Sequence, residues 1–305
     1  IGAGTYTSLV QIVAEALKFP VSMVRLPMEK DTDHDPYDWQ TVASKGLVLS
    51  GNACILAAKD LLAKAYECAA QVLRANVCDL DHDQEKVFLK HHPDQHVTFR
   101  SMSVGYAYPN GNGVGGPLVG VGRYIAQGLT YLDKATGQGK PALDWTYGAH
   151  GMIVAVNEKT GHYDVLKIAS AFDCGRAINP VCVRGQIIGG VIQGLGTAMC
   201  EGYIYDAAGR LLNPSFTDNK IPTSLDLPEE MECFSVETAQ VDGPYGARGV
   251  GEHPMIAVGG ALGNSIQNAC GADLSHMPIR GEDVWRALHG KKKVASAPAI
   301  TRRKK

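Results

Sequence analysis

The feature that most restricts how this chain can fold is the glycine-rich segment Gly243–Pro254, with the sequence Gly-Pro-Tyr-Gly-Ala-Arg-Gly-Val-Gly-Glu-His-Pro. Glycine can adopt positive φ and lets backbone approach a ligand closely. The apolar run that follows Pro254 can begin a helix. The carboxylate of Glu252 therefore lies where a flexible turn becomes a fixed element.

Two interpretations of Glu252 follow from this position. A carboxylate held partly out of water at such a junction could act as a general base near neutral pH. Alternatively, Glu252 lies in the first helical turn, where a negative charge interacts favourably with the helix dipole. The spacing of residues alone favours the second interpretation.

The stretch Gly249–Glu252, followed by an apolar helix, resembles the active-site signature of the molybdenum hydroxylases, the family of xanthine dehydrogenase and aldehyde oxidase. Further stretches resemble the same family in the expected order: Gly2–Thr7, Asp31–Asp33, Thr41–Ser44, Thr146–Ala149, Asp173–Pro180, Gly185–Gln186, Gln193–Gly196 and Lys220–Thr223. The ordered set extends from the first residues to about Leu288.

The resemblance implies an α+β fold with two-layer α/β sandwich subdomains and mixed sheets, as the alternation of strand pairs and helices also suggests. Residues 1–140 would form the first molybdopterin-binding subdomain with a glycine-rich connector, and residues 141–290 the second, which carries Glu252. The implied cofactor is molybdenum–molybdopterin, in its cytosine dinucleotide form, with the metal held through the pterin and not by side chains. The implied cofactor-binding residues are Gly2, Ala3, Gly4, Thr5, Ala43, Ser44, Gln186 and Gly251.

The N-terminal turn and Ser44 carry further expectations. In the family, the glycine turn Gly2–Gly4 and the helix after it lie along the cofactor phosphates, a use of helix N-termini that physics favours. The family usually has Gln where this chain has Ala3, so one side-chain hydrogen bond to the cofactor is not expected, although the backbone contacts could survive. Ser44 matches a family position at the cofactor, although it could equally be a helix cap.

The resemblance also implies a reaction and a set of partners. Glu252 would be the general base in hydroxylation of an electron-poor carbon of an N-heterocycle, purine or nicotinate-like, or of an aldehyde, with oxygen supplied by water. Electrons would pass to iron–sulfur clusters and FAD on partner chains or segments. The other half of the molybdenum domain is absent, so we expect the chain alone to be inactive. The alternative is a non-catalytic cofactor-binding or assembly fragment.

Composition and charge indicate which partners, location and cysteine chemistry to expect. The chain has 305 residues, a formal charge of −2 and a pI near 6.6, which does not suggest a nucleic-acid partner. We expect no membrane span and a cytoplasmic location. Eight cysteines occur without a C-x-x-C pair, so we expect buried thiols that neither pair nor bind metal. The basic end, residues 291–305, is predicted to be a disordered tail.

Two motifs could indicate a specific binding site, a metal site in one case and a dinucleotide site in the other, but we do not favour either. Residues 75–100 contain several His and Asp, but without metal-ligand spacing on a helix, so a solvated insertion is preferred to a metal site. Gly111–Gly116 satisfies G-x-G-x-x-G, with Asp133 downstream. No clean helix follows that motif, so Ser101–Pro141 is interpreted as a connection and not as a dinucleotide site.

The hydrophobic pattern predicts the remaining elements. These are helices at Thr5–Lys18, Val42–Leu73, from Pro180 onward and Pro254–Ala269; strands at Val21–Leu26, Ala149–Val156 and Tyr163–Phe172; and a strand pair around Tyr203 and Phe234 that brackets the turn Asp206–Gly209.

Overall fold

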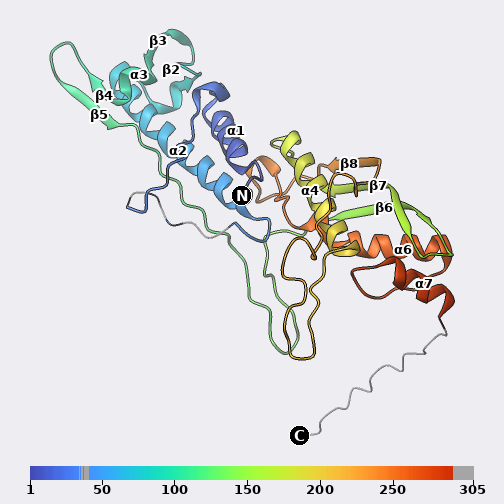
Figure 1. The fold of residues 1–305 in the computed structure, drawn as a ribbon. Coiled ribbons are helices and arrows are strands. Elements are labelled where there is room, and N and C mark those ends of the chain that lie inside the picture. Colours follow the sequence, from blue (N-terminus) through green and yellow to red (C-terminus); the bar gives the residue numbers. More distant parts are fainter. Residues whose placement is uncertain (34, 36, 38–40, 291–305) are drawn as a thin grey trace. The chain divides into compact units, whose positions relative to one another are not determined.

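The computed structural model describes residues 1–33, 35, 37 and 41–290 and has the predicted α+β composition (Figure 1). Its residues fall into two compact units. Unit 1 contains Ile1–Gly148, Phe172–Ile187 and Ser235–His253, and unit 2 contains Ala149–Ala171, Ile188–Phe234 and the described residues from Pro254 onward. The chain thus passes repeatedly between the units. The predicted boundary between residues 140 and 141 divides the chain into two consecutive domains, whereas each unit is assembled from three separate segments. The boundary stays a prediction. The basic tail lies outside the described residues.

Unit 1 is built on two helices, α1 (Thr5–Leu17) and α2 (Gly46–Leu73). The buried Ile12 of α1 packs at Gly51 of α2, where an added Cβ would come within 3.0 Å of the Ile12 Cδ1 atom and 2.8 Å of Pro244. Glycine at that position therefore lets α1 and the 3-10 helix η3 (Pro244–Gly246) approach the same turn of α2.

The far half of α2 supports a small sheet. A 3-10 turn, η2 (Val77–Asp79), leads into the antiparallel strands β1 (Leu80–His82), β2 (Lys86–Leu89) and β3 (His92–Thr98), followed by α3 (Phe99–Met102). Leu80, Val87, Val97 and Met102 are buried against α2. The stretch is largely solvated as expected, with His91, His92 and His96 exposed, but alternate residues of these short strands also supply a small core that the polar composition concealed.

The G-x-G-x-x-G stretch forms part of a hairpin. Strands β4 (Val104–Ala107) and β5 (Gly113–Pro117) pair antiparallel. The chain then runs along α2, where the Asp60 carboxylate accepts from the Val121 N–H at 2.8 Å and Lys64 donates to the Val119 carbonyl at 2.8 Å. This segment is a connection, and the glycines of the motif serve a hairpin.

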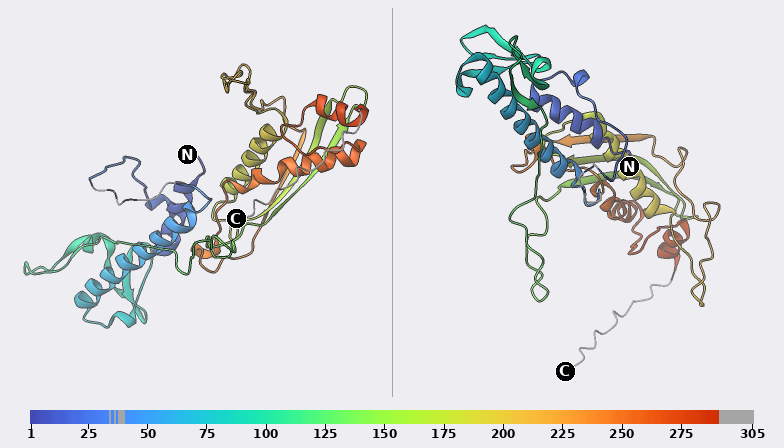
Figure 2. Two further views of the ribbon diagram at one scale, coloured as in Figure 1. Left: turned by 90° about the horizontal axis from the view of Figure 1, so that it is seen from below. Right: turned by 90° about the vertical axis from the view of Figure 1, so that its left-hand side faces the viewer.

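Unit 2 contains most of a three-stranded sheet in the order β6 (Gly148–Val156), β7 (Tyr163–Asp173) and β8 (Glu230–Val236). Helices α4 (Pro180–Met199) and α6 (Val258–Cys270) contribute to its core, as does α7 (Gly281–His289) (Figure 2). The fully buried residues include Val191 and Leu195 of α4 with Leu262 and Ile266 of α6. The hydroxyl of Tyr163 also donates to the Ile279 carbonyl at 2.6 Å within this core.

Several predicted elements differ from the observed ones. Val21–Leu26 is not a strand, since η1 (Val21–Met23) follows Pro20 and no strand lies beside it among the described residues. The predicted partner of the strand around Phe234 is also wrong. Tyr205 forms only an isolated bridge with Leu211 across the confirmed turn, whereas β8 pairs with β7.

Helix boundaries shift where the backbone leaves the helical conformation. The long helix begins at Gly46 and not at Val42, because Ala43 and Ser44 adopt positive φ of 58° and 54°. The last predicted helix is split into α5 (His253–Ile256) and α6, because Ala257 has φ −90° and ψ 0°. Helix α7 was not predicted.

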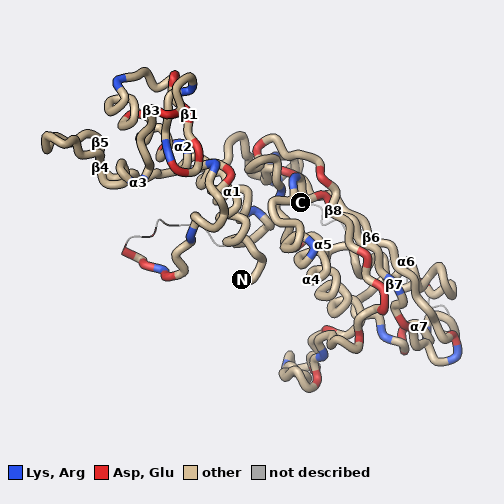
Figure 3. The backbone as a smooth tube through the Cα atoms, turned by 90° about the horizontal axis from the view of Figure 1, so that it is seen from above, with Lys and Arg blue, Asp and Glu red and all other residues tan. Residues whose placement is uncertain are grey.

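Helix α2 is long and apolar enough to cross a membrane when length and composition alone are considered. Of its most apolar 18 residues, 22% are buried, and α2 contacts α1 and the strands β2–β5. In Figure 3, Lys and Arg of the described residues are interspersed with Asp and Glu, and no single basic band is visible. All eight cysteines are free thiols.

Candidate functional site

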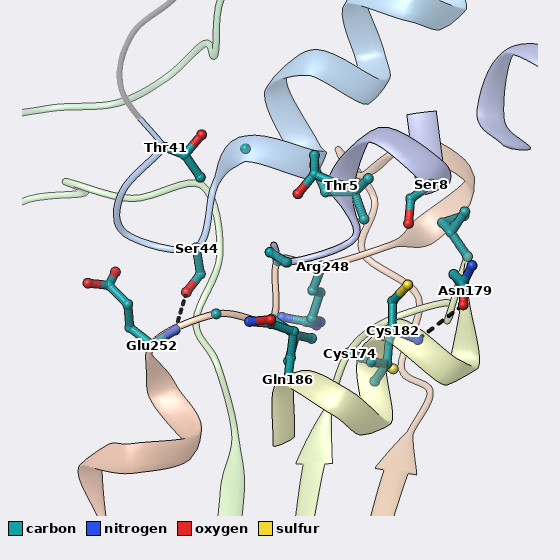
Figure 4. Close-up of a pocket in the computed structure, with 18 of the residues that line it drawn as sticks. Thr5, Ser8, Thr41, Ser44, Cys174, Asn179, Cys182, Gln186, Arg248 and Glu252 are labelled. Atoms are coloured by element: carbon teal, nitrogen blue, oxygen red, sulfur yellow. Dashed lines mark hydrogen bonds between the residues drawn. The ribbon is translucent and has the colours of Figure 1, made fainter. Parts of the chain in front are cut away.

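Unit 1 contains a pocket of about 260 Å³ that brings together segments far apart in the sequence (Figure 4). Its lining residues come from the N-terminal turn and α1, from the loop into α2, from the stretch 174–186 and from the stretch 248–252. They are Ile1, Ala3, Thr5, Ser8, Thr41, Val42, Ser44, Gly46, Leu47, Cys174, Arg176, Ile178, Asn179, Cys182, Val183, Gln186, Arg248, Gly249, Val250, Gly251 and Glu252.

The beginnings of three helices line this pocket. Thr5 begins α1, Gly46 begins α2, and Cys182 lies in the first turn of α4. None of these three turns, all within the described residues, contains an acidic side chain. The N–H groups and the dipole at a helix N-terminus favour anions. The pocket wall is therefore suited to a ligand that carries phosphate.

Local contacts hold α1 and α4 together at the pocket. The Asn179 side chain accepts from the Cys182 N–H at 3.1 Å and donates to the Gln11 side chain of α1 at 3.0 Å. Gly4, at φ 76°, precedes α1 and packs so closely on Cys182 that a Cβ there would overlap the thiol. Gly4 thus satisfies both a left-handed turn and a close helix contact.

The glycines of Gly249–Glu252 have a similar packing role. A Cβ on Gly249 would overlap the Ser44 carbonyl oxygen, and one on Gly251 would lie 2.9 Å from the Ser44 Oγ atom. The Ser44 hydroxyl accepts from the Glu252 N–H at 3.0 Å (Figure 4). Ser44 is therefore not the cap of α2, whose N-cap is Lys45. Its side chain fixes the backbone at Glu252 instead.

A buried ion pair supports the same wall. The Arg248 Nε atom lies 3.7 Å from the Asp173 carboxylate, and both side chains are about one-tenth exposed. Burial raises the pKa of Asp173, but hydrogen bonds from the Gly175 and Thr238 N–H groups and the charge of Arg248 outweigh it, so the pKa is lowered overall. Arg248 also donates to the Trp145 carbonyl at 2.8 Å. Arg248 therefore supports the pocket wall as a guanidinium whose charge is balanced by Asp173.

The structure brings most of the predicted site residues together. Ala3, Thr5, Ser44, Gln186, Gly251 and Glu252 line the pocket, whereas Gly2, Gly4 and Ala43 are adjacent in sequence to lining residues. Their assigned roles stay predictions.

The expectation that Glu252 is partly withdrawn from water is not met within this chain. The residue is exposed, and its carboxylate points away from Gln186 in Figure 4. The physical reason is that Glu252 directly precedes the short helix α5 at the rim of the pocket, where its side chain meets solvent.

Sequence reasoning missed several lining residues. Arg248 lies inside the glycine-rich segment, and Arg176 and Asn179 lie inside Asp173–Pro180, so both stretches had been singled out as motifs without assigning these side chains. Arg176 beside the predicted beginning of the helix at Pro180 is the sequence signal that would have indicated an anion site. Cys174 also lines the pocket, and burial together with the nearby Glu237 charge raises its pKa to about 11.

Comparison with known proteins assigns the chain that forms this pocket to a family. The family model described as the molybdopterin cofactor-binding domain matches residues 1–228, which include the N-terminal turn, the Ser44 loop and Gln186. The chain belongs to the molybdopterin-binding domains of the molybdenum hydroxylases. The helix N-termini and arginines of the pocket fit a phosphate-bearing pterin cofactor of this kind.

Relatives of this molybdopterin-binding domain include enzyme subunits. The probable hypoxanthine oxidase XdhD of Escherichia coli (strain K12) is 32% identical over 289 residues, covering 94% of this chain and 28% of the relative. The gamma subunit of the 6-hydroxypseudooxynicotine dehydrogenase complex of Paenarthrobacter nicotinovorans is 28% identical, covering 95% of this chain and 35% of the relative.

Solved structures share the fold of this domain. The Cu,Mo-CO dehydrogenase has a TM-score of 0.79 at 28% identity and is matched over 94% of this chain and 35% of its own. Quinoline 2-oxidoreductase from Pseudomonas putida 86 has a TM-score of 0.77 at 26% identity, over 95% of this chain and 36% of its own. The chain thus spans about one-third of the length of the relatives it matches.

Proposed function

We propose that this chain is the cofactor-binding part of a molybdenum hydroxylase that uses water to hydroxylate an electron-poor carbon of an N-heterocycle or an aldehyde. The observation that carries the proposal is the pocket of unit 1, in which three helix N-termini and two arginines surround Ser44, Gln186 and Glu252. Relatives are named as oxidases or dehydrogenases of hypoxanthine, 6-hydroxypseudooxynicotine and carbon monoxide.

Different residues of this chain would serve cofactor binding and proton transfer. The first turns of α1 and α4, with the exposed Arg176, would hold the phosphate side of the cofactor. When bound, the molybdenum cofactor supplies the oxidation chemistry. Gln186 offers an amide that can donate or accept a hydrogen bond beside the reacting centre.

Glu252 would accept a proton from the attacking oxygen nucleophile. Its backbone is held by Ser44, but its side chain is exposed in this chain. We infer that a counterpart of the part of the relatives that this chain does not match covers this rim and excludes water from the carboxylate. The same reasoning predicts that the 305-residue chain alone binds the cofactor poorly and does not turn over.

We also propose that the pterin carries the cytosine dinucleotide and that electrons leave to iron–sulfur clusters and FAD on partner chains or segments. The eight free cysteines are scattered over both units, whereas an iron–sulfur cluster needs clustered thiolates. A visible iron–sulfur absorption band from the purified chain would contradict this electron path.

A second candidate is a non-catalytic fragment that binds or assembles the cofactor. Two observations favour it: Ala3 stands at the pocket where the family usually has Gln, and the Glu252 side chain is exposed. Molybdenum content and turnover, measured on the chain assembled with its partner polypeptides, separate the two candidates. Molybdenum bound without turnover supports the non-catalytic reading.

The role of Glu252 is tested in the same assembled sample. Glu252→Gln removes the base but keeps the size of the side chain, so turnover should fall by about 10²-fold or more while molybdenum content is unchanged. Glu158→Gln, at an exposed turn of unit 2, is the matched control. A near-normal rate for Glu252→Gln would eliminate Glu252 as the base.

A further inference from the structure

A second cavity of unit 1, the α1 cavity, shares part of its wall with the pocket described above. It has a volume of about 350 Å³ and is lined by α1, by the stretch 176–178 and by Tyr245 of η3. Arg176 and Ile178 line both spaces. A ligand whose phosphates lie at the first turns of α1 and α4 can therefore extend past Arg176 into the α1 cavity.

The guanidinium of Arg176 is available to an anion where the two spaces meet. The backbone N–H of Arg176 donates to the Gly246 carbonyl at 2.9 Å, which fixes the residue beside η3. Arg176 is exposed, and its side chain makes no hydrogen bond or ion pair with a described residue. Arginine binds phosphate through paired hydrogen bonds. Arg176 is thus placed for a phosphate that lies between the pocket and the α1 cavity.

Two polar side chains line the α1 cavity one helical turn apart. Gln11 and Glu15 have the i, i+4 spacing that places side chains on one face of a helix. The Gln11 side-chain oxygen accepts from the Asn179 side chain at 3.0 Å, so the Gln11 amide nitrogen is left as a donor. The carboxylate of Glu15 makes no hydrogen bond or ion pair with a described residue and offers acceptors alone.

This donor and acceptor pair fits an uncharged base better than a phosphate. The Glu15 carboxylate repels phosphate, which leaves that group to Arg176. Carboxylates accept from the exocyclic amino group of cytosine. The ring nitrogen and the carbonyl beside that amino group are acceptors, which the Gln11 amide can satisfy. The α1 face of the cavity therefore matches the hydrogen-bonding edge of cytosine.

An aromatic ring borders the same cavity from an uncommon backbone conformation. Tyr245 has φ 53° and ψ 24°, and such left-handed geometry is uncommon for a residue with a side chain. Uncommon backbone conformations cluster at ligand sites. Burial raises the pKa of the Tyr245 hydroxyl and the charge of Glu15 acts in the same direction, which places the ring near that carboxylate. The ring offers a face on which a base can stack.

We propose that the α1 cavity is a subsite for the nucleotide end of the pterin cofactor, with a phosphate at Arg176 and a cytosine base beside Tyr245, Gln11 and Glu15. The inference rests on the proposed function, because it takes the cofactor from that function. Selectivity follows from Glu15. Uracil has a carbonyl where cytosine has its amino group, so the carboxylate of Glu15 disfavours a uridine nucleotide.

The test uses the full 305-residue chain and defined probes. The probes are cytidine diphosphate, uridine diphosphate and inorganic pyrophosphate. Dissociation constants are measured by NMR titration of the isotope-labelled chain, with each probe raised to millimolar concentration, because the chain alone is expected to bind the cofactor weakly. Cytidine diphosphate should shift the amides of residues 11–15 and bind about tenfold more tightly than uridine diphosphate, through one hydrogen bond to a charged group.

Three substitutions separate the contacts. Arg176→Gln should weaken cytidine diphosphate and pyrophosphate alike by about tenfold, and Arg176→Lys, which keeps the charge, should restore part of the loss. Glu15→Gln should remove the preference for cytidine over uridine and leave pyrophosphate unchanged. Tyr245→Asn removes the ring but keeps a residue type that tolerates positive φ. It should weaken both nucleotides by about fivefold or more.

Matched controls come from exposed positions of unit 1 that line neither space. Arg184→Gln on α4 controls for loss of a positive charge, and Glu67→Gln on α2 controls for loss of a negative one. Neither should change the affinity for any probe. All variants must keep the wild-type thermal midpoint, so that unfolding does not imitate lost binding.

Each outcome supports or overturns the proposal. Cytidine-selective binding that depends on Arg176, Glu15 and Tyr245 supports it. Absence of amide shifts at residues 11–15, equal affinity for the two nucleotides, or unchanged affinity in Arg176→Gln overturns it. Molybdenum content and turnover of the assembled enzyme are measured separately. Selective nucleotide binding without turnover leaves the subsite standing while the proposed function fails, and turnover without nucleotide binding does the reverse.

Discussion

The hydroxyl of Ser44 accepts a hydrogen bond from the backbone N–H of Glu252 at 3.0 Å, across 208 positions of sequence. Ser44 adopts positive φ of 54°, an uncommon conformation for a residue with a side chain. Unusual backbone geometry of this kind persists where surrounding structure determines it. Here the surrounding structure is the stretch Gly249–Glu252, which passes directly against Ser44.

The first prediction concerns this hydrogen bond. Ser44→Ala removes the acceptor and should lower the free energy of unfolding by about 1 kcal/mol. Amide exchange at Glu252 should also become faster. Ser103→Ala is a suitable control, because its hydroxyl donates to the Arg100 carbonyl at an exposed turn away from the pocket. Unchanged exchange at Glu252 in Ser44→Ala would show that the bond does not hold this backbone.

The second prediction concerns the close approach of Gly249 to Ser44. Gly249→Ala places a Cβ on the Ser44 carbonyl oxygen, so one backbone segment has to move. We expect a loss of about 2 kcal/mol or more in stability, in the range of severe packing changes. Gly260→Ala is the control, since nothing lies within 4 Å of its added Cβ in α6. That control should gain up to about 1 kcal/mol through helix propensity. Similar stability in the two variants would contradict the packing role of Gly249.

The parts of the fold that the sequence predicted well are those set by local pattern. The amphipathic stretch of α1 and the two long strands β6 and β7 were predicted within about one residue of their observed ends. The turn Asp206–Gly209 was also predicted, because Asp accepting from its own loop and Gly at positive φ are local signals. Each of these elements carries its determinants within a few residues.

Other features depend on distant residues and could not be predicted from local pattern. Ala43 and Ser44 adopt positive φ where the distant Gly249 and Gly251 pack against Ser44, and no rule based on local sequence places the first turn of α2 at Gly46. The strands β1–β3 are short and polar, and only α2 reveals which of their residues are buried. The site itself was predicted as separate motifs, but the convergence of helix N-termini and Arg248 needed the structure.

The third prediction concerns the buried pair of Asp173 and Arg248. Asp173→Asn keeps an oxygen for the Gly175 and Thr238 N–H groups but leaves Arg248 without its counter-charge. We expect a loss of about 3 kcal/mol at pH 7. The pKa of Asp173 is lowered in the folded state, so this contribution is present above the unfolded pKa near 3.8 and is lost as the pH falls through the lower folded value.

The measurement is urea unfolding of wild type and Asp173→Asn between pH 3 and pH 7. Asp206→Asn is the matched control, because Asp206 pairs with Arg210 at the surface, where such pairs contribute about 1 kcal/mol or less. A difference between wild type and Asp173→Asn that stays constant as the pH falls would show that the charge of Asp173 does not stabilise the fold.

The fourth prediction concerns His253, which follows Glu252 directly. Its ring is buried, lies 5.4 Å from that of Phe172 and has no hydrogen-bond partner for either nitrogen among the described residues. Burial lowers the pKa of His253, with the charge of Glu252 acting in the opposite direction. His253→Phe replaces two unpaired polar atoms with an apolar ring, so stability at pH 7.5 should be equal to wild type or higher by about 1 kcal/mol.

The pH dependence makes the His253 prediction specific. Because the folded pKa lies below the unfolded value of 6.5, the unfolded chain binds a proton first as the pH falls. The free energy of unfolding of the wild type therefore decreases between pH 6.5 and the lower folded pKa. Phe cannot titrate, so the stability advantage of His253→Phe should widen from pH 7.5 to pH 5. Thermal unfolding across this range measures it, with the exposed His91→Phe as the surface control. An advantage that does not change with pH would mean that His253 is not held neutral by its surroundings.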